Sequence, residues 1–156
     1  CKMVPNHPTD QWTVPRTLNG VAEFKREYDN DPDVKRLVDL AKIIVEGVDA
    51  ALEVARPGNT AEQVEAAWQA VLRKHGLRKD SRVGYPIGLA YPPDWGERTA
   101  SLRPGDRTVL QAGMCFHIQS GLWLQDYGAA ISESFVVGAG GGERLCDAPR
   151  DLIVVA

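Results

Sequence analysis

Four polar side chains in the second half of this chain are of types that carry out chemistry: Tyr85, His117, Gln119 and Glu133. Glu133 is the most informative of them. It is a lone carboxylate within the apolar segment 131–137, and burying a carboxylate is costly unless it is paired. This segment alternates like a strand, so Ser132 and Ser134 should point to the side opposite Glu133. We therefore expect Glu133 to hold a functional position.

The other three candidates have both functional and structural interpretations. His117 and Gln119 are two residues apart in the alternating segment 115–118 and just after it, so both should face one side of a strand. If that side is a pocket, they can hydrogen-bond a ligand; otherwise His117 is a structural histidine. Tyr85 either works through its hydroxyl or is a half-buried aromatic residue with its hydroxyl in water.

The motifs around these residues resemble the catalytic half of the creatinase, aminopeptidase P and methionine aminopeptidase superfamily, which has the pita-bread fold. Its metal-dependent members use two Asp, one His and two Glu ligands. This chain has Tyr85 at the His place, within Gly84-Tyr85-Pro86-Ile87-Gly88, and Gln119 at the first Glu place, after Ala112-Gly113-Met114. Glu133 stands at the second Glu place. Tyr-Pro-Ile-Gly followed by Tyr-Pro-Pro-Asp-Trp-Gly-Glu is most similar to the ectoine hydrolases, which are ring-opening amidohydrolases.

This resemblance implies that the metal ligands are incomplete. The two Asp ligands should lie upstream, the second three residues before an Arg-Thr pair; Arg16-Thr17 resembles that pair, and Thr13 then takes the Asp place. A phenol with a pKa near ~10 is a poor ligand at neutral pH, and Gln119 offers only a neutral carbonyl. We therefore expect no metal and no other cofactor.

A metal-free hydrolase of the same superfamily is the first functional hypothesis. By resemblance to ectoine hydrolase and creatinase, it would break a C–N bond in a small cyclic cationic compound. Tyr85 would stabilise an oxyanion or donate a proton, and Glu133 would transfer a proton or bind the cationic nitrogen. His117 and Gln119 would bind substrate. Trp95 and Trp123 would wall the pocket, where cation–π attraction helps.

Two alternatives remain open. The first is a non-catalytic pita-bread remnant that binds a small ligand or a partner chain. It is favoured by the non-ligand residues Thr13, Tyr85 and Gln119 at the metal-ligand places. The second is a metal-dependent Xaa-Pro peptidase, which would need the missing ligands. The resemblance covers about residues 33 to 155 and leaves 1–30 poorly matched, so the chain is expected to be a single, partial catalytic domain, acting as a homodimer or with a missing N-terminal half.

The elements that must position these residues follow from periodicity. Apolar residues recur at three- and four-residue steps over 32–56 and again over 60–76, which predicts two helices joined by a short turn at Arg56-Pro57-Gly58. Strands are expected at 115–118, 121–124, 131–137 and 152–155, with a hairpin turn in the glycine run 138–142. Helices on one face of a mostly antiparallel sheet constitute the α+β class.

Composition excludes several classes of protein. The chain has 156 residues, a natural length for one domain, with 18 basic and 21 acidic residues interspersed for a net charge of −3. Nothing indicates a nucleic-acid or membrane partner, since there is no basic patch and no apolar run near ~20 residues. Three cysteines without a C-x-x-C pair, and no apolar signal segment, favour a cytoplasmic protein with reduced thiols.

Overall fold

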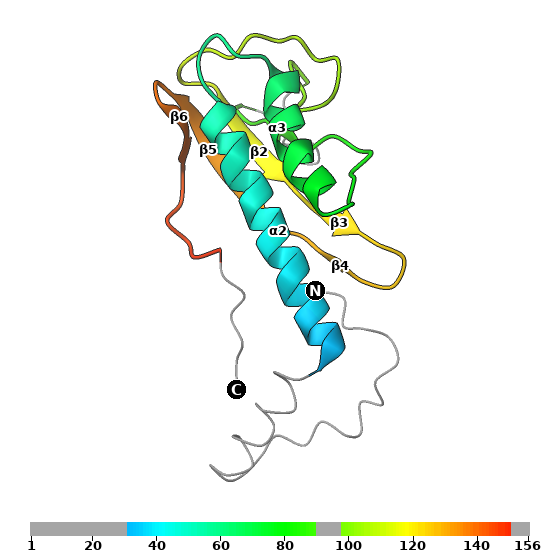
Figure 1. Ribbon diagram of the computed structural model, residues 1–156. Coiled ribbons are helices and arrows are strands. Elements are labelled where there is room, and N and C mark those ends of the chain that lie inside the picture. Colours follow the sequence, from blue (N-terminus) through cyan, green and yellow to red (C-terminus); the bar gives the residue numbers. More distant parts are fainter. Residues whose placement is uncertain (1–30, 90–97, 151–156) are drawn as a thin grey trace.

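A computed structural model describes residues 31–89 and 98–150, and its two helices lie across one face of an antiparallel sheet (Figure 1). The first helix, α2, spans Pro32–Val54. Asp31 caps its start, because its carboxylate accepts a hydrogen bond from the Asp33 N–H at 2.8 Å, and proline suits the first turn. The chain leaves the helix just before Pro57, as proline requires. The helix predicted over 32–56 is therefore confirmed.

The second helix, α3, spans Ala61–Lys74 and confirms the helix predicted over 60–76. The Gln63 side chain accepts a hydrogen bond from the Thr60 N–H at 2.7 Å, as in a capping box. Trp68 is fully buried between the two helices and the sheet. Gly47 of α2 makes room for it, because a β-carbon at that position would lie 2.7 Å from the Trp68 Nε1.

A four-stranded sheet carries the candidate site. Its strands are β1 (Gly84–Pro86), β2 (Cys115–Gln119), β5 (Ser132–Gly138) and β6 (Gly141–Arg144), in the order β1-β2-β5-β6, and every neighbouring pair is antiparallel. A small second sheet pairs β3 (Leu122–Trp123) with β4 (Gly128–Ala129). This arrangement confirms the α+β class.

Most strand predictions hold within a residue or two. The predicted strands 115–118 and 131–137 are β2 and β5, and the segment 121–124 contains the two-residue β3. The glycine run forms the predicted hairpin, in which Gly138 pairs with Gly141 across the turn. The strand expected at 152–155 lies outside the described residues.

The two faces of the sheet differ in character. Phe116, Ile118, Phe135 and Val137 alternate along β2 and β5 and are all buried with the helices in one core. Each such side chain contributes about 1.5–3 kcal/mol when fully removed from water. The intervening residues of β2 and β5 lie on the opposite face and are less buried.

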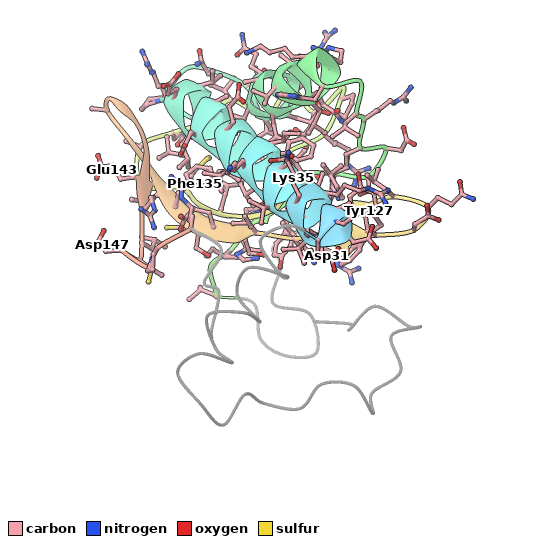
Figure 2. The ribbon with its side chains drawn as sticks, turned by 60° about the horizontal axis from the view of Figure 1, so that its bottom comes forward. Asp31, Lys35, Tyr127, Phe135, Glu143 and Asp147 are labelled. Atoms are coloured by element: carbon pink, nitrogen blue, oxygen red, sulfur yellow. The ribbon has the colours of Figure 1, made fainter. Side chains whose placement is uncertain are left out.

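The first turns of α2 are tied to the β3–β4 connection. The Arg36 guanidinium lies 4.2 Å from the centre of the Tyr127 ring, and Figure 2 shows Tyr127 close to the start of α2, near Asp31. In the same view Phe135 lies beside the middle of α2, in the core. Within residues 31–89 and 98–150, no helix is long and apolar enough to cross a membrane.

Candidate functional site

The strand register brings three polar residues into one row across the sheet. Tyr85 of β1 is opposite His117 of β2, and His117 is opposite Ser134 of β5. Side chains of directly opposed residues in an antiparallel sheet lie on the same face. Tyr85, His117 and Ser134 therefore share the face that the helices do not cover.

These three residues also touch. The Tyr85 and His117 rings are 5.4 Å apart between centroids and tilted by 46°. The His117 Nδ1 lies 2.9 Å from the Ser134 Oγ, which is hydrogen-bond distance. The Arg82 guanidinium covers the Tyr85 ring, 4.9 Å from its centre. A continuous polar row thus runs from Arg82 through Tyr85 and His117 to Ser134.

His117 in this row has the properties of a proton acceptor. Burial lowers the pKa of its imidazole, although the negative charge of the nearby Glu133 carboxylate opposes that shift. Because the net shift is downward, the imidazole is neutral near pH 7. A neutral imidazole can accept the Ser134 hydroxyl proton at Nδ1, which is the contact that a general base makes with a nucleophile.

Glu133 is placed differently from the sequence-based expectation. It pairs in register with Ile118, and it is buried with only 6% of its surface exposed. The sequence analysis gives Tyr85, Gln119 and Glu133 roles toward one substrate, whereas strand alternation puts Glu133 on the helix side of the sheet and the other two on the opposite face. The prediction that Ser134 points the other way is confirmed by its hydrogen bond to His117.

Two arginines that the sequence analysis did not single out surround Glu133. The Arg144 Nε donates to the Glu133 Oε2 at 2.7 Å, and the Arg150 Nε lies 3.9 Å from the same oxygen. Arg150 also pairs with Asp49 of α2. In a hairpin that turns at 138–142, Arg144 pairs with Phe135 and lies on the same face of the sheet as Glu133. The hairpin signal in the sequence is therefore sufficient to identify Arg144 as a partner of Glu133.

His117 and Glu133 nevertheless meet at one cavity. It has a volume of about 460 Å³ and lies beside the part of β5 that β6 does not pair with. Ser134, Arg144 and Arg150 also line it. The lining therefore includes an imidazole, two serine hydroxyls, a thiol, a carboxylate and two guanidinium groups, while Tyr85 and Gln119 lie outside it.

The remaining predicted residues are scattered. Gln119 is exposed at the end of β2, with Ser132 as its cross-strand partner. Trp123 is 76% exposed in β3, and its ring packs closely over Gly128 rather than walling the cavity. Trp95 lies outside the described residues, as do Thr13 and Arg16-Thr17 at the upstream ligand places.

The described residues do not offer a metal centre. In residues 31–89 and 98–150, no group of three or more His, Cys, Asp or Glu side chains is arranged to hold a metal ion. Tyr85 contributes a phenol and Gln119 a neutral amide at two of the expected ligand places. The carboxylate of Glu133 at a third place is engaged by Arg144. Within residues 31–89 and 98–150, these three side chains do not by themselves fit a dinuclear metal site.

Comparison with known proteins gives a consistent family. The model of metallopeptidase family M24 matches residues 16–139. Ectoine hydrolase from Halomonas elongata is 50% identical over 112 residues, which cover 71% of this chain and 28% of that protein. An uncharacterized hydrolase/peptidase from Sinorhizobium fredii is also 50% identical, over 116 residues that cover 74% of this chain and 30% of the relative. The chain thus spans less than a third of these relatives' length.

Solved structures agree with this assignment. Dipeptidase PepE from Mycobacterium ulcerans superposes with a TM-score of 0.69 at 33% identity, covering 80% of this chain and 32% of that one. A dipeptidase from Pyrococcus horikoshii gives a TM-score of 0.69 at 29% identity, covering 78% and 33%. The chain belongs to metallopeptidase family M24 and forms part of its pita-bread fold.

Proposed function

We propose that this chain supplies part of the active site of a hydrolase that breaks a C–N bond in a small cyclic cationic compound, as an ectoine hydrolase or a creatinase does. The observation that carries the proposal is the His117–Ser134 hydrogen bond beside Tyr85, which puts a base, a hydroxyl nucleophile and a proton donor in one row. The 50% identity to ectoine hydrolase from Halomonas elongata supports the substrate class.

The proposed reaction does not use a metal ion, although the family is named for metallopeptidases. This part of the proposal rests on donor chemistry. A phenol with a pKa near ~10 keeps its proton at neutral pH and donates hydrogen bonds instead of binding a cation. Gln119 carries no charge to offset that of a metal ion, and Glu133 already neutralises the Arg144 guanidinium.

Each residue of the row then has a role. The neutral imidazole of His117 accepts the Ser134 proton, so that the hydroxyl oxygen can attack the carbon of the C–N bond and displace the nitrogen. Water, deprotonated by the same imidazole, then cleaves the new bond between Ser134 and the substrate carbon and restores the hydroxyl. Tyr85 donates a hydrogen bond to the negative charge that develops in the transition state, or a proton to the departing nitrogen. The Arg82 guanidinium lies over the Tyr85 ring, 4.9 Å from its centre, and helps to hold the ring in place beside His117.

Glu133 acts through His117 in this scheme and is a positioning residue. Its carboxylate raises the pKa of the imidazole that burial would otherwise lower further. It therefore stabilises the imidazolium that forms when His117 takes a proton. The neighbouring guanidinium groups of Arg144 and Arg150 suit the carboxylate of a zwitterionic substrate, whereas the cationic part of such a molecule suits Glu133.

A second candidate is a subunit that binds a small ligand or a partner chain without catalysis. The closed Glu133–Arg144 pair favours it, because a carboxylate that is already neutralised is a weak acid–base group. Two large apolar side chains, Leu89 and Trp123, are 101% and 76% exposed. A homodimer partner or an additional protein segment that covered them would remove this apolar surface from water. A third candidate, a metal-dependent Xaa-Pro peptidase, is supported by the 30% identity to the Xaa-Pro dipeptidase of Lactobacillus helveticus.

Ectoine hydrolysis by serine variants separates these functions. Proton NMR follows ring opening by the wild-type chain and by the Ser134→Ala and Ser132→Ala variants. Ser132 is the matched control, because it lies two residues away on the same strand and the same face but does not bond to His117. The proposal predicts a loss of about 100-fold or more for Ser134→Ala only. Equal turnover by both variants would remove Ser134 from the mechanism, and no ring opening by any form would favour the binding subunit.

A further inference from the structure

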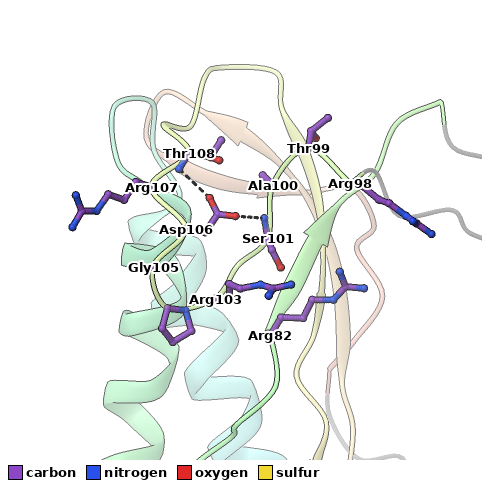
Figure 3. A pocket seen from close by; sticks show the side chains of 11 residues that line it. Arg82, Arg98, Thr99, Ala100, Ser101, Arg103, Gly105, Asp106, Arg107 and Thr108 are labelled. Carbon is purple, nitrogen blue, oxygen red and sulfur yellow. Dashed lines mark hydrogen bonds between the residues drawn. The ribbon is translucent and has the colours of Figure 1, made fainter.

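A second cavity lies away from the His117 site, between Arg82, which precedes β1, and the segment 98–108, which connects β1 to β2. It has a volume of about 840 Å³. Its lining includes four arginines and one carboxylate: Arg82, Arg98, Arg103, Arg107 and Asp106 (Figure 3). Such an excess of guanidinium groups around one hollow is typical of oxyanion binding, since arginine recognises carboxylate and phosphate through paired N–H donors.

Asp106 offsets only part of this positive charge, since one carboxylate faces four guanidinium groups, and its oxygens are bonded to the backbone. It accepts hydrogen bonds from the Ser101 N–H at 2.7 Å and from the Thr108 N–H at 3.0 Å. Burial would raise the pKa of this carboxyl group, but these hydrogen bonds and the positive charge of Arg103 lower it overall. Asp106 therefore holds the loop in shape, and Arg82 and Arg103 line the cavity beside it.

Ser101 gives independent evidence of a ligand. Only 6% of its surface is exposed, and its Oγ is enclosed without a hydrogen-bond partner among the described residues. A buried hydroxyl without a partner is costly, and native proteins rarely leave one so. A bound oxyanion would accept the hydroxyl proton and supply the missing partner.

The geometry of two arginines matches this hydroxyl. In Figure 3 the side chains of Arg82 and Arg103 extend toward the same part of the cavity, and the Ser101 hydroxyl points to that part as well. Arg107 contributes less, because it is 87% exposed and lies 3.9 Å from Glu62. Arg82 also covers the Tyr85 ring, so an anion here would be bound next to the proposed reaction row.

We infer that this cavity is a binding site for a small oxyanion, a carboxylate or phosphate group, held by Arg82, Arg103 and the Ser101 hydroxyl. The site is distinct from the His117 cavity, with which it shares no lining residue. It stands whether or not the chain is catalytic. Its ligand is recognised by negative charge and by the capacity to accept three or more hydrogen bonds, which inorganic phosphate and acetate represent as probes.

Isothermal titration of the chain with inorganic phosphate and with acetate tests the site, with sodium chloride added to keep ionic strength constant. The variants are Ser101→Ala, Arg103→Gln and the control Arg73→Gln, which removes another exposed arginine, from the last turn of α3 and outside the cavity. Loss of one charge-assisted hydrogen bond corresponds to about a ten- to hundredfold weaker affinity. We expect that loss for Ser101→Ala and Arg103→Gln and wild-type affinity for Arg73→Gln.

The two probes decide between the sources of the oxyanion. Tighter binding of phosphate than of acetate assigns the site to phosphorylated ligands, and the reverse assigns it to carboxylates; both support the inference. Absence of binding by either probe to the wild-type chain overturns it. An equal loss in all three variants also overturns it, because nonspecific attraction to surface arginines would then explain the binding. Circular dichroism of each variant verifies that the fold is retained.

Discussion

Replacing Glu133 with glutamine removes the charge from a largely buried ion pair at the candidate site. Glu133 is 6% exposed and Arg144 is 29% exposed, with 2.7 Å between the Glu133 Oε2 and the Arg144 Nε. Deleting one partner of a buried ion pair costs about 3–5 kcal/mol. Glutamine keeps the volume and one acceptor oxygen, so it loses the charge assistance and one of the two acceptors that bind the Ser134 N–H and the Arg144 Nε. The loss of charge assistance is about 1 kcal/mol for each guanidinium contact, from the difference between charged and neutral hydrogen bonds.

We therefore expect Glu133→Gln to lower the free energy of unfolding by about 1–2 kcal/mol, and Glu133→Leu to lower it by about 3–5 kcal/mol. With a urea m-value of about 2 kcal/mol/M, the glutamine variant should unfold at about 0.5–1 M less urea. Equilibrium urea denaturation followed by tryptophan fluorescence measures both midpoints. In any ring-opening assay, the same variant should lower turnover by about 100-fold, the usual scale for proton-transfer chemistry.

Glu143→Gln is the control for this experiment, because Glu143 is an exposed glutamate on the neighbouring strand β6. Its midpoint should stay within the error of the wild-type value. The double variant Glu133→Leu/Arg144→Met should recover most of the stability that Glu133→Leu loses, since no buried charge is then left unpaired. The reasoning is refuted if Glu133→Gln unfolds at the same urea concentration as Glu143→Gln, or if turnover is unchanged while stability rises.

Two further predictions concern His117 and Gly47. Because burial lowers the pKa of the folded-state imidazole, the unfolded chain binds more protons as pH falls below about 6.5, so stability should decrease there. His117→Gln should abolish that decrease, and urea midpoints between pH 5 and 7.5 measure it; an unchanged pH profile would contradict the neutral imidazole. Gly47→Ala should cost about 1–3 kcal/mol, because the new β-carbon would lie 2.7 Å from Trp68 Nε1. A thermal midpoint equal to that of the wild type would show that Trp68 repacks freely.

The fold could be predicted largely from local chemistry. The period of the apolar residues, with Pro32 at the start and Pro57 after the end, fixed the first helix to within two residues. The capping pair Thr60 and Gln63 marked the second helix. The glycine run 138–142 predicted the β5–β6 hairpin. In the structure, Gly141 of this turn has a positive φ of 147° and lies against the backbone of α2.

The site could be predicted only in part, because it depends on pairing between distant strands. Residue types selected His117 and Glu133, which do line one cavity. The sequence did not show that β2 pairs with β5 so that His117 faces Ser134 while Glu133 faces Ile118. Arg144 carries no motif of its own, and only the register of the β5–β6 hairpin places it beside Glu133. Arg150 gave no local signal, since it reaches Glu133 from an irregular segment after the last described strand.

Turnover of ectoine by the metal-depleted chain tests the central claim most directly. The chain is dialysed exhaustively against a chelator, its metal content is measured by elemental analysis, and ring opening is followed by proton NMR before and after manganese, cobalt, iron or zinc is restored. The account predicts ring opening that is unchanged by chelation and by added metal, and that is lost in Tyr85→Phe, which removes only the hydroxyl. Activity that disappears on chelation and returns with two equivalents of metal per chain would contradict it.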